Sequence, residues 1–172
     1  MIYQFNGKCQ ESQQFQLNVD VGSVHTFFEL HLALQSALHF QPVQLASFLV
    51  PLSKGRRHIE ITMIGPGNGR SGVYSMQDTL IGEIMIPGRK SIFYLFDSLN
   101  DRFINLQLTG TNMDENLREP LVTLKRGEIP IQTIDEVISG DLMVAEVKSA
   151  DPNYGVLNDY YGIFGEMEEF VL

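Results

Sequence analysis

Residues 14–21 constrain the fold most, because polar and apolar side chains alternate through this run without a break. Side chains along a β-strand point to opposite faces in turn. The run therefore predicts a strand with one face on a core and the other in water, which is typical of an antiparallel sheet. Its apolar face consists of Phe15, Leu17, Val19 and Val21.

Residues 24–40 predict the main helix. Apolar side chains recur there at three- and four-residue steps, the spacing of one helix face. We expect Ser23 to cap its first turn and Val24 to lie beside the apolar stripe. The stripe itself consists of Phe27, His31, Leu34 and Leu38.

Shorter runs predict the rest of the fold. Residues 91–96 are apolar on both faces, which predicts a central strand covered on both sides. Asp78 is placed to cap a short helix over residues 78–84. Residues 65–72 are rich in glycine and predict a hairpin loop. We expect further strands at residues 2–5, 48–50, 59–64, 102–109 and 121–125.

These elements predict an α+β fold, with a mostly antiparallel sheet, one main amphipathic helix packed on a face, and short helices. The formal charge of -9 is uneven: residues 133–172 hold nine acids and one base, Lys148, a net of -8. Residues 1–132 therefore carry a net charge of -1, which is -9 minus -8. We therefore expect a domain of residues 1–132 and an acidic C-terminal extension of residues 133–172, packed on or next to the domain.

Composition narrows the setting of the protein. The chain has one cysteine, Cys9, which cannot form an intramolecular disulfide and fits a reducing cytosol. No signal peptide or membrane span is recognisable, so we expect a cytoplasmic protein with no membrane partner. The negative charge of the whole chain argues against strong nonspecific nucleic-acid binding, and the oligomeric state stays open.

Histidine and aspartate supply the candidate chemistry. His25, His31 and His39 are too far apart on one helix to share a metal ion, so we expect no metal site and no cofactor. His31 lies in the apolar stripe, which favours a hydrogen-bonded core histidine over a catalytic one. Asp97 and Asp101 flank a turn, where aspartates that bond their own backbone are commoner than acid–base or cation pairs.

Two other segments suggest binding. One is a small basic patch that suits phosphate, although a solvated turn is favoured; it consists of Lys54, Arg56, Arg57 and His58. Arg70 is a further candidate for contact with nucleic acid. The C-terminal extension mixes acids with aromatic residues, which suits either docking on a protein partner or folding back on the domain. The aromatic candidates are Tyr160, Tyr161, Phe164 and Phe170.

Residues 26–40, TFFELHLALQSALHF, and 93–97, FYLFD, resemble two motifs of the root-inducing-plasmid ORF-three-like family, whose members are described as passengers of insertion elements. The helix resembles the family's Thr-Leu-x-x-Leu-His…Gln-x-Ala segment, and the strand resembles its Tyr-x-Tyr-Asp segment. The likeness extends over roughly the first 130 residues and implies a single α+β domain with no established reaction.

This chain departs from the family pattern after both motifs. Ser98 follows the strand in place of the usual Phe-Gly-Asp-x-Trp continuation, and residues 44–48, QLASF, stand where His-Leu-His-Glu-Phe is usual. Of the family's polar positions, only His31 and Asp97 carry over. The resemblance therefore implies a divergent member with a worn or lost site.

The leading hypothesis is a non-enzymatic intracellular binding or accessory protein with an unknown protein partner, from a mobile-element-associated family. One alternative is a metal-assisted or hydrolase-like enzyme using His31, Asp97 and Asp101, which requires these side chains to converge in one pocket. Another is a weak nucleic-acid binder through the turn at Lys54, Arg56 and Arg57.

Overall fold

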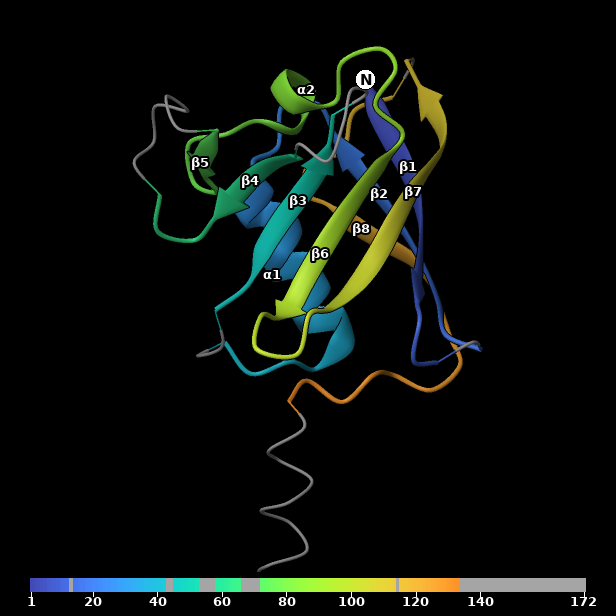
Figure 1. The fold of residues 1–172 in the computed structure, drawn as a ribbon. Helices are drawn as coiled ribbons and strands as arrows, with labels where there is room; N and C mark the ends of the chain where they lie inside the picture. Colours follow the sequence, from blue (N-terminus) through green and yellow to red (C-terminus); the bar gives the residue numbers. More distant parts are fainter. Residues whose placement is uncertain (13, 43–44, 53–57, 66–71, 114, 134–172) are drawn as a thin grey trace, which may run out of the picture. The chain divides into compact units, whose positions relative to one another are not determined.

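The computed structural model describes residues 1–12, 14–42, 45–52, 58–65, 72–113 and 115–133. Contacts divide the chain into two units, Met1–Ile134 and Asp135–Leu172, and all described residues belong to the first (Figure 1). Within the described part of the chain, no helix is long and apolar enough to cross a membrane.

One eight-stranded sheet dominates the described residues, in the order β5-β4-β3-β6-β7-β1-β2-β8. Every neighbouring pair is antiparallel except β4 and β5, which are parallel. This confirms the prediction of a mostly antiparallel, sheet-rich fold. The strands are β1 (Ile2–Cys9), β2 (Gln16–Gly22), β3 (Ser47–Pro51), β4 (His58–Thr62), β5 (Val73–Ser75), β6 (Ser91–Asp97), β7 (Arg102–Asn112) and β8 (Leu121–Arg126).

The alternating run forms β2, which pairs with β1 as a hairpin from Ile2 opposite Gly22 to Gly7 opposite Leu17. Leu17, Val19 and Val21 are fully buried, and the polar residues between them are half-buried. The prediction of one core face and one wetter face is confirmed for this strand.

Helix α1 (Phe27–Leu38) is shorter than expected from the sequence. Thr26 caps it, because its side chain accepts a hydrogen bond from the Glu29 amide while the Glu29 carboxylate accepts one from the Thr26 amide. This reciprocal capping box satisfies two amides that lack helical partners. The predicted cap at Ser23 is wrong, and Val24, outside the helix, is 73% exposed.

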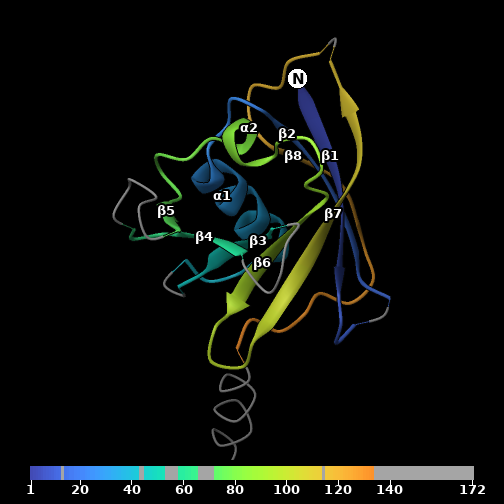
Figure 2. The ribbon, with the colours of Figure 1, turned by 45° about the horizontal axis from the view of Figure 1, so that its top comes forward.

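The core lies between α1 and the sheet, which curves around the helix (Figures 1 and 2). Phe27, Leu30 and Leu34 of α1 are fully buried. The Phe27 ring lies 5.2 Å from that of Phe48 on β3, in an edge-to-face contact. Edge-to-face packing of this kind adds stability beyond the area that it buries.

Three further expectations need correction. β6 is central in the sheet, but Phe93 and Leu95 on its second face are only half-buried, so the described residues do not cover that face as its apolar sequence suggested. Helix α2 spans only Ile81–Ile84, and Leu80 rather than Asp78 is its N-cap. The glycine-rich loop does not close a hairpin, because the strand that follows it, β5, is parallel to β4.

Candidate functional site

His31 forms a buried polar pair with Tyr94. The His31 side chain is 1% exposed, and its Nδ1 shares a hydrogen bond of 3.0 Å with the Tyr94 hydroxyl on β6. Burial lowers the pKa of His31 to about 4 and raises the pKa of Tyr94, because both charged forms lose hydration. The arrangement is that of a neutral, hydrogen-bonded core histidine, as the sequence favoured.

Asp97, at the end of β6, is bound by the turn that follows it. Its carboxylate accepts hydrogen bonds from the backbone amide and side-chain amide of Asn100, at 3.3 and 2.9 Å. Burial raises its pKa, but the hydrogen bonds from Asn100 and Arg102, together with the Arg102 charge, outweigh this effect and lower it. Asp101 in the same turn is exposed, with a left-handed φ of 52°.

Arg102 ties Asp97 into a network at this end of the sheet. Its guanidinium donates to Glu11 at 2.5 and 2.6 Å, to Asp97 at 3.4 Å and to the Gln132 carbonyl at 3.3 Å. It also lies 5.1 Å from the centre of the Phe96 ring. The network joins the β1–β2 connection, the β6–β7 turn and the segment after β8. The buried carboxylate and guanidinium therefore have hydrogen-bond partners within the chain.

The structure does not unite the candidate catalytic residues. Among the described residues, no hydrogen bond or ion pair joins His31 to Asp97 or Asp101. Nor does that part of the chain hold a cluster of three or more histidines, cysteines or acids able to bind a metal. The binding candidates lie outside the described residues: Lys54, Arg56, Arg57, Arg70, Tyr160, Tyr161, Phe164 and Phe170.

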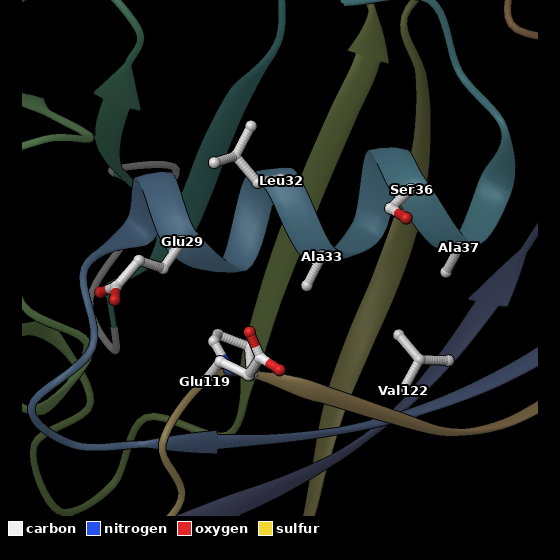
Figure 3. Close-up of a pocket in the computed structure, with 8 residues that line it drawn as sticks. Glu29, Leu32, Ala33, Ser36, Ala37, Glu119 and Val122 are labelled. Atoms are coloured by element: carbon white, nitrogen blue, oxygen red, sulfur yellow. The ribbon is translucent and has the colours of Figure 1, made fainter.

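A groove with a volume of about 490 Å³ lies between α1 and the start of β8. Figure 3 shows Ala33 and Ala37 pointing down from the helix toward Glu119 and Val122 on the opposite wall. It also shows Leu32, 47% exposed, pointing away from that wall. The lining residues are Glu29, Leu32, Ala33, Ser36, Ala37, Glu119, Pro120 and Val122.

The two ends of this groove differ in charge. The carboxylates of Glu29 and Glu119 belong to the end where α1 and β8 begin. Beyond the other end, the Lys125 ammonium donates to the Ala37 carbonyl at 2.6 Å and lies 3.3 Å from Nε2 of His39. A ligand in the groove therefore meets Glu119 and Glu29 at one end, where Thr26 already donates to the Glu29 carboxylate. It meets small apolar side chains in the middle and a cation past the other end.

Sequence reasoning missed this groove. The α1 residues that line it belong to the helix face opposite the predicted stripe, where a mixture such as Leu32, Ala33 and Ser36 normally indicates ordinary solvent contact. The opposite wall comes from a strand about ninety residues later in the chain. The one local signal is Leu32, an apolar residue on the polar face.

Comparison with known proteins identifies the fold and nothing finer. No protein-family model and no curated protein matches the sequence. The structure is similar to the crystal structure of MM3350, a protein of unknown function from Methanosarcina mazei Go1, with a TM-score of 0.63 and 17% identity. The likeness covers 96% of this chain and 90% of that one.

Proposed function

We propose that this chain is a non-enzymatic binding protein that holds a segment of a protein partner in the groove between α1 and β8. The observation that carries the proposal is the groove itself, which mixes apolar side chains such as Ala33 and Ala37 with polar ones and presents Glu29 and Glu119 at one end. Concave sites with apolar walls and a few placed polar groups are typical of binding sites.

The groove geometry favours a short peptide segment. From Glu29 to Ala37 the helix rises about 12 Å, at about 1.5 Å per residue, which matches about four residues of extended chain. Charge complementarity indicates a lysine or arginine of the partner against Glu29 and Glu119. A small apolar side chain fits over Ala33 and Ala37, whose methyl groups leave the groove open.

Side chains rather than strand addition are expected to give the affinity. β8 is an edge strand that pairs with β2 alone, but its register shifts between Asn18 and Val19 of β2. Its last two residues are Lys125 and Arg126. Irregular pairing and terminal charges both discourage the addition of another strand.

The wider assignment belongs to the same proposal. We assign the chain to the α+β class, with α1 as its main amphipathic helix, and support this with the buried Leu30, His31 and Leu34. We also propose a divergent member of the root-inducing-plasmid ORF-three-like, mobile-element-associated family, acting in the cytoplasm with a protein partner. No contact among the described residues supports the enzymatic alternative, and Lys54, Arg56 and Arg57 of the nucleic-acid alternative lie outside them.

A displayed library of random peptides, selected against the full chain, tests the proposal. We expect selected peptides to carry a lysine or arginine beside small apolar residues. Ala33→Arg fills the groove and should weaken their binding at least about tenfold, measured by isothermal titration, since it removes apolar contact and repels the cation. Gln77→Arg places the same side chain at an exposed position away from the groove and is the matched control.

Two results would overturn the proposal. One is selected peptides that bind Ala33→Arg as tightly as Gln77→Arg. The other is a library that yields no peptide protecting α1 or β8 amides from hydrogen exchange. Glu119→Gln separates charge from shape, because it should weaken cationic peptides while leaving the groove the same size.

A further inference from the structure

A row of five side chains crosses the sheet on the face away from α1. The register pairs Glu60 with Leu49, Leu49 with Phe93, Phe93 with Asn105 and Asn105 with Lys8. Paired residues on neighbouring strands share a face, so the row runs continuously over β4, β3, β6, β7 and β1. Figure 1 looks onto this face, with α1 behind it.

The row has a carboxylate at one end and an ammonium at the other, with the apolar Leu49 and Phe93 and the polar Asn105 between them. Leu49, Phe93, Leu95 and Phe103 are half-buried on this face, and the Phe93 and Phe103 rings meet edge to face at 5.2 Å. Within the described part of the chain, no helix or strand covers them. Apolar side chains bordered by charge are the composition of an interface centre and its rim.

We propose that a second copy of this chain covers the face, so that two sheets pack against each other around a twofold axis. An axis parallel to the strands places Glu60 of each copy opposite Lys8 of the other and stacks the two Phe93 rings near the centre. An axis along the row would instead oppose Glu60 to Glu60. The charges therefore select the axis parallel to the strands, which also aligns the two sheets as in sandwich folds.

The dimensions of the two sheets agree with this arrangement. Packed sheets lie about 10 Å apart, a gap that lysine and glutamate side chains span together. A hollow of about 260 Å³ adjoins Glu60 and one of about 270 Å³ adjoins Lys8, which leaves room for the opposing side chain. Neither Glu60 nor Lys8 has an ion-pair partner among the described residues.

The contact is small because the sheet curves away from it on both sides (Figure 2). The contact is centred on β3, β6 and β7, with Glu60 on β4 and Lys8 on β1 at its margins, so the dimer belongs to the weak, transient class of interfaces. The groove between α1 and β8 lies on the other side of the sheet. The dimer therefore neither requires nor blocks the proposed partner site.

Sedimentation velocity on the full chain, from about 1 μM to about 1 mM, tests the proposal with a charge swap. Glu60→Lys opposes two lysines and Lys8→Glu opposes two glutamates, so each should raise the dissociation constant at least about tenfold. The double variant restores opposite charges across the axis and should return the constant close to that of the wild type. Glu128→Lys makes the same charge change at an exposed position outside the row.

The swap separates this dimer from nonspecific association. A wild-type chain that stays monomeric to about 1 mM overturns the proposal. So do single variants that behave like Glu128→Lys, or a double variant as weak as either single one. Ala33→Arg should leave the dimer intact, which keeps this outcome independent of the test of the groove.

Discussion

Acid should weaken the folded state through His31 well above the pH at which carboxylates become protonated. Burial lowers the pKa of His31 to about 4 in the folded chain, whereas an unfolded chain has the ordinary value of about 6.5. Between these values the unfolded chain binds a proton that the folded chain does not. Stability is therefore lost as the pH falls from about 6.5 to about 4.

The size of the effect follows from the two pKa values. A difference of about 2.5 between the folded and unfolded pKa of His31 limits the loss of stability to about 3.4 kcal/mol, and about 2 kcal/mol of this loss is reached by pH 5. Asp97 contributes in a lower window, because its folded pKa is lowered and its stabilisation is lost only below its ordinary range. Measurements between pH 7 and pH 5 therefore exclude the contribution of Asp97, and a His31 variant identifies the part that belongs to this histidine.

Urea unfolding of the wild type and of His31→Gln at pH 7 and pH 5 measures the effect. Glutamine keeps a polar group near the Tyr94 hydroxyl but does not titrate. Between pH 7 and pH 5 the free energy of unfolding of His31→Gln should therefore fall by about 2 kcal/mol less than that of the wild type. At a typical slope of about 2 kcal/mol per molar urea, this is a difference of about 1 M in midpoint. His58→Gln, at an exposed position on β4, is the control. Equal losses in wild type and His31→Gln would refute the reasoning.

Three further predictions use the same unfolding assay. Thr26→Ala removes the hydroxyl that accepts the Glu29 amide and should cost about 1 kcal/mol; no loss would show that the capping box is not used. Arg102→Met leaves buried Asp97 unpaired and should cost about 3–5 kcal/mol, more than Glu11→Gln, whose side chain is 45% exposed. Gly127→Ala places a Cβ 2.2 Å from the Gln14 carbonyl oxygen at a φ of +83°, whereas Gly88→Ala has a φ of +97° but open space. The first variant should therefore lose more stability than the second, and equal losses would contradict the clash.

Local periodicity predicted the elements of this fold well. Alternation through residues 14–21 located β2, and three- and four-residue spacing located the buried face of α1, because both patterns arise within one element. The helix start was misplaced although a usable signal was present. Thr26 is followed three residues later by Glu29, the capping-box spacing, whereas Ser23 is followed three residues later by Thr26 itself.

The groove could not be predicted from the sequence, because it depends on pairing between strands that lie far apart in the chain. Glu29 and Glu119 share a groove only because β8 pairs with β2, at the opposite end of the sheet from β5. The parallel pairing of β5 with β4 similarly overrode a glycine-rich segment that predicted a hairpin. Neither pairing has a local signature, since strand order depends on which edges meet during folding rather than on any single run of residues.

The correction at β6 differs from the others because the sequence pattern itself was sound. Phe93 and Leu95 are apolar, and their strand is central, which are the two properties from which coverage on both sides was expected. Only the source of the second layer was assumed, namely another element of the same chain. An antiparallel sheet tolerates one wet face, and the proposed dimer would instead cover the edge-to-face rings of Phe93 and Phe103 on it. The charge swap at Glu60 and Lys8 decides whether that second layer is another copy of the same sheet.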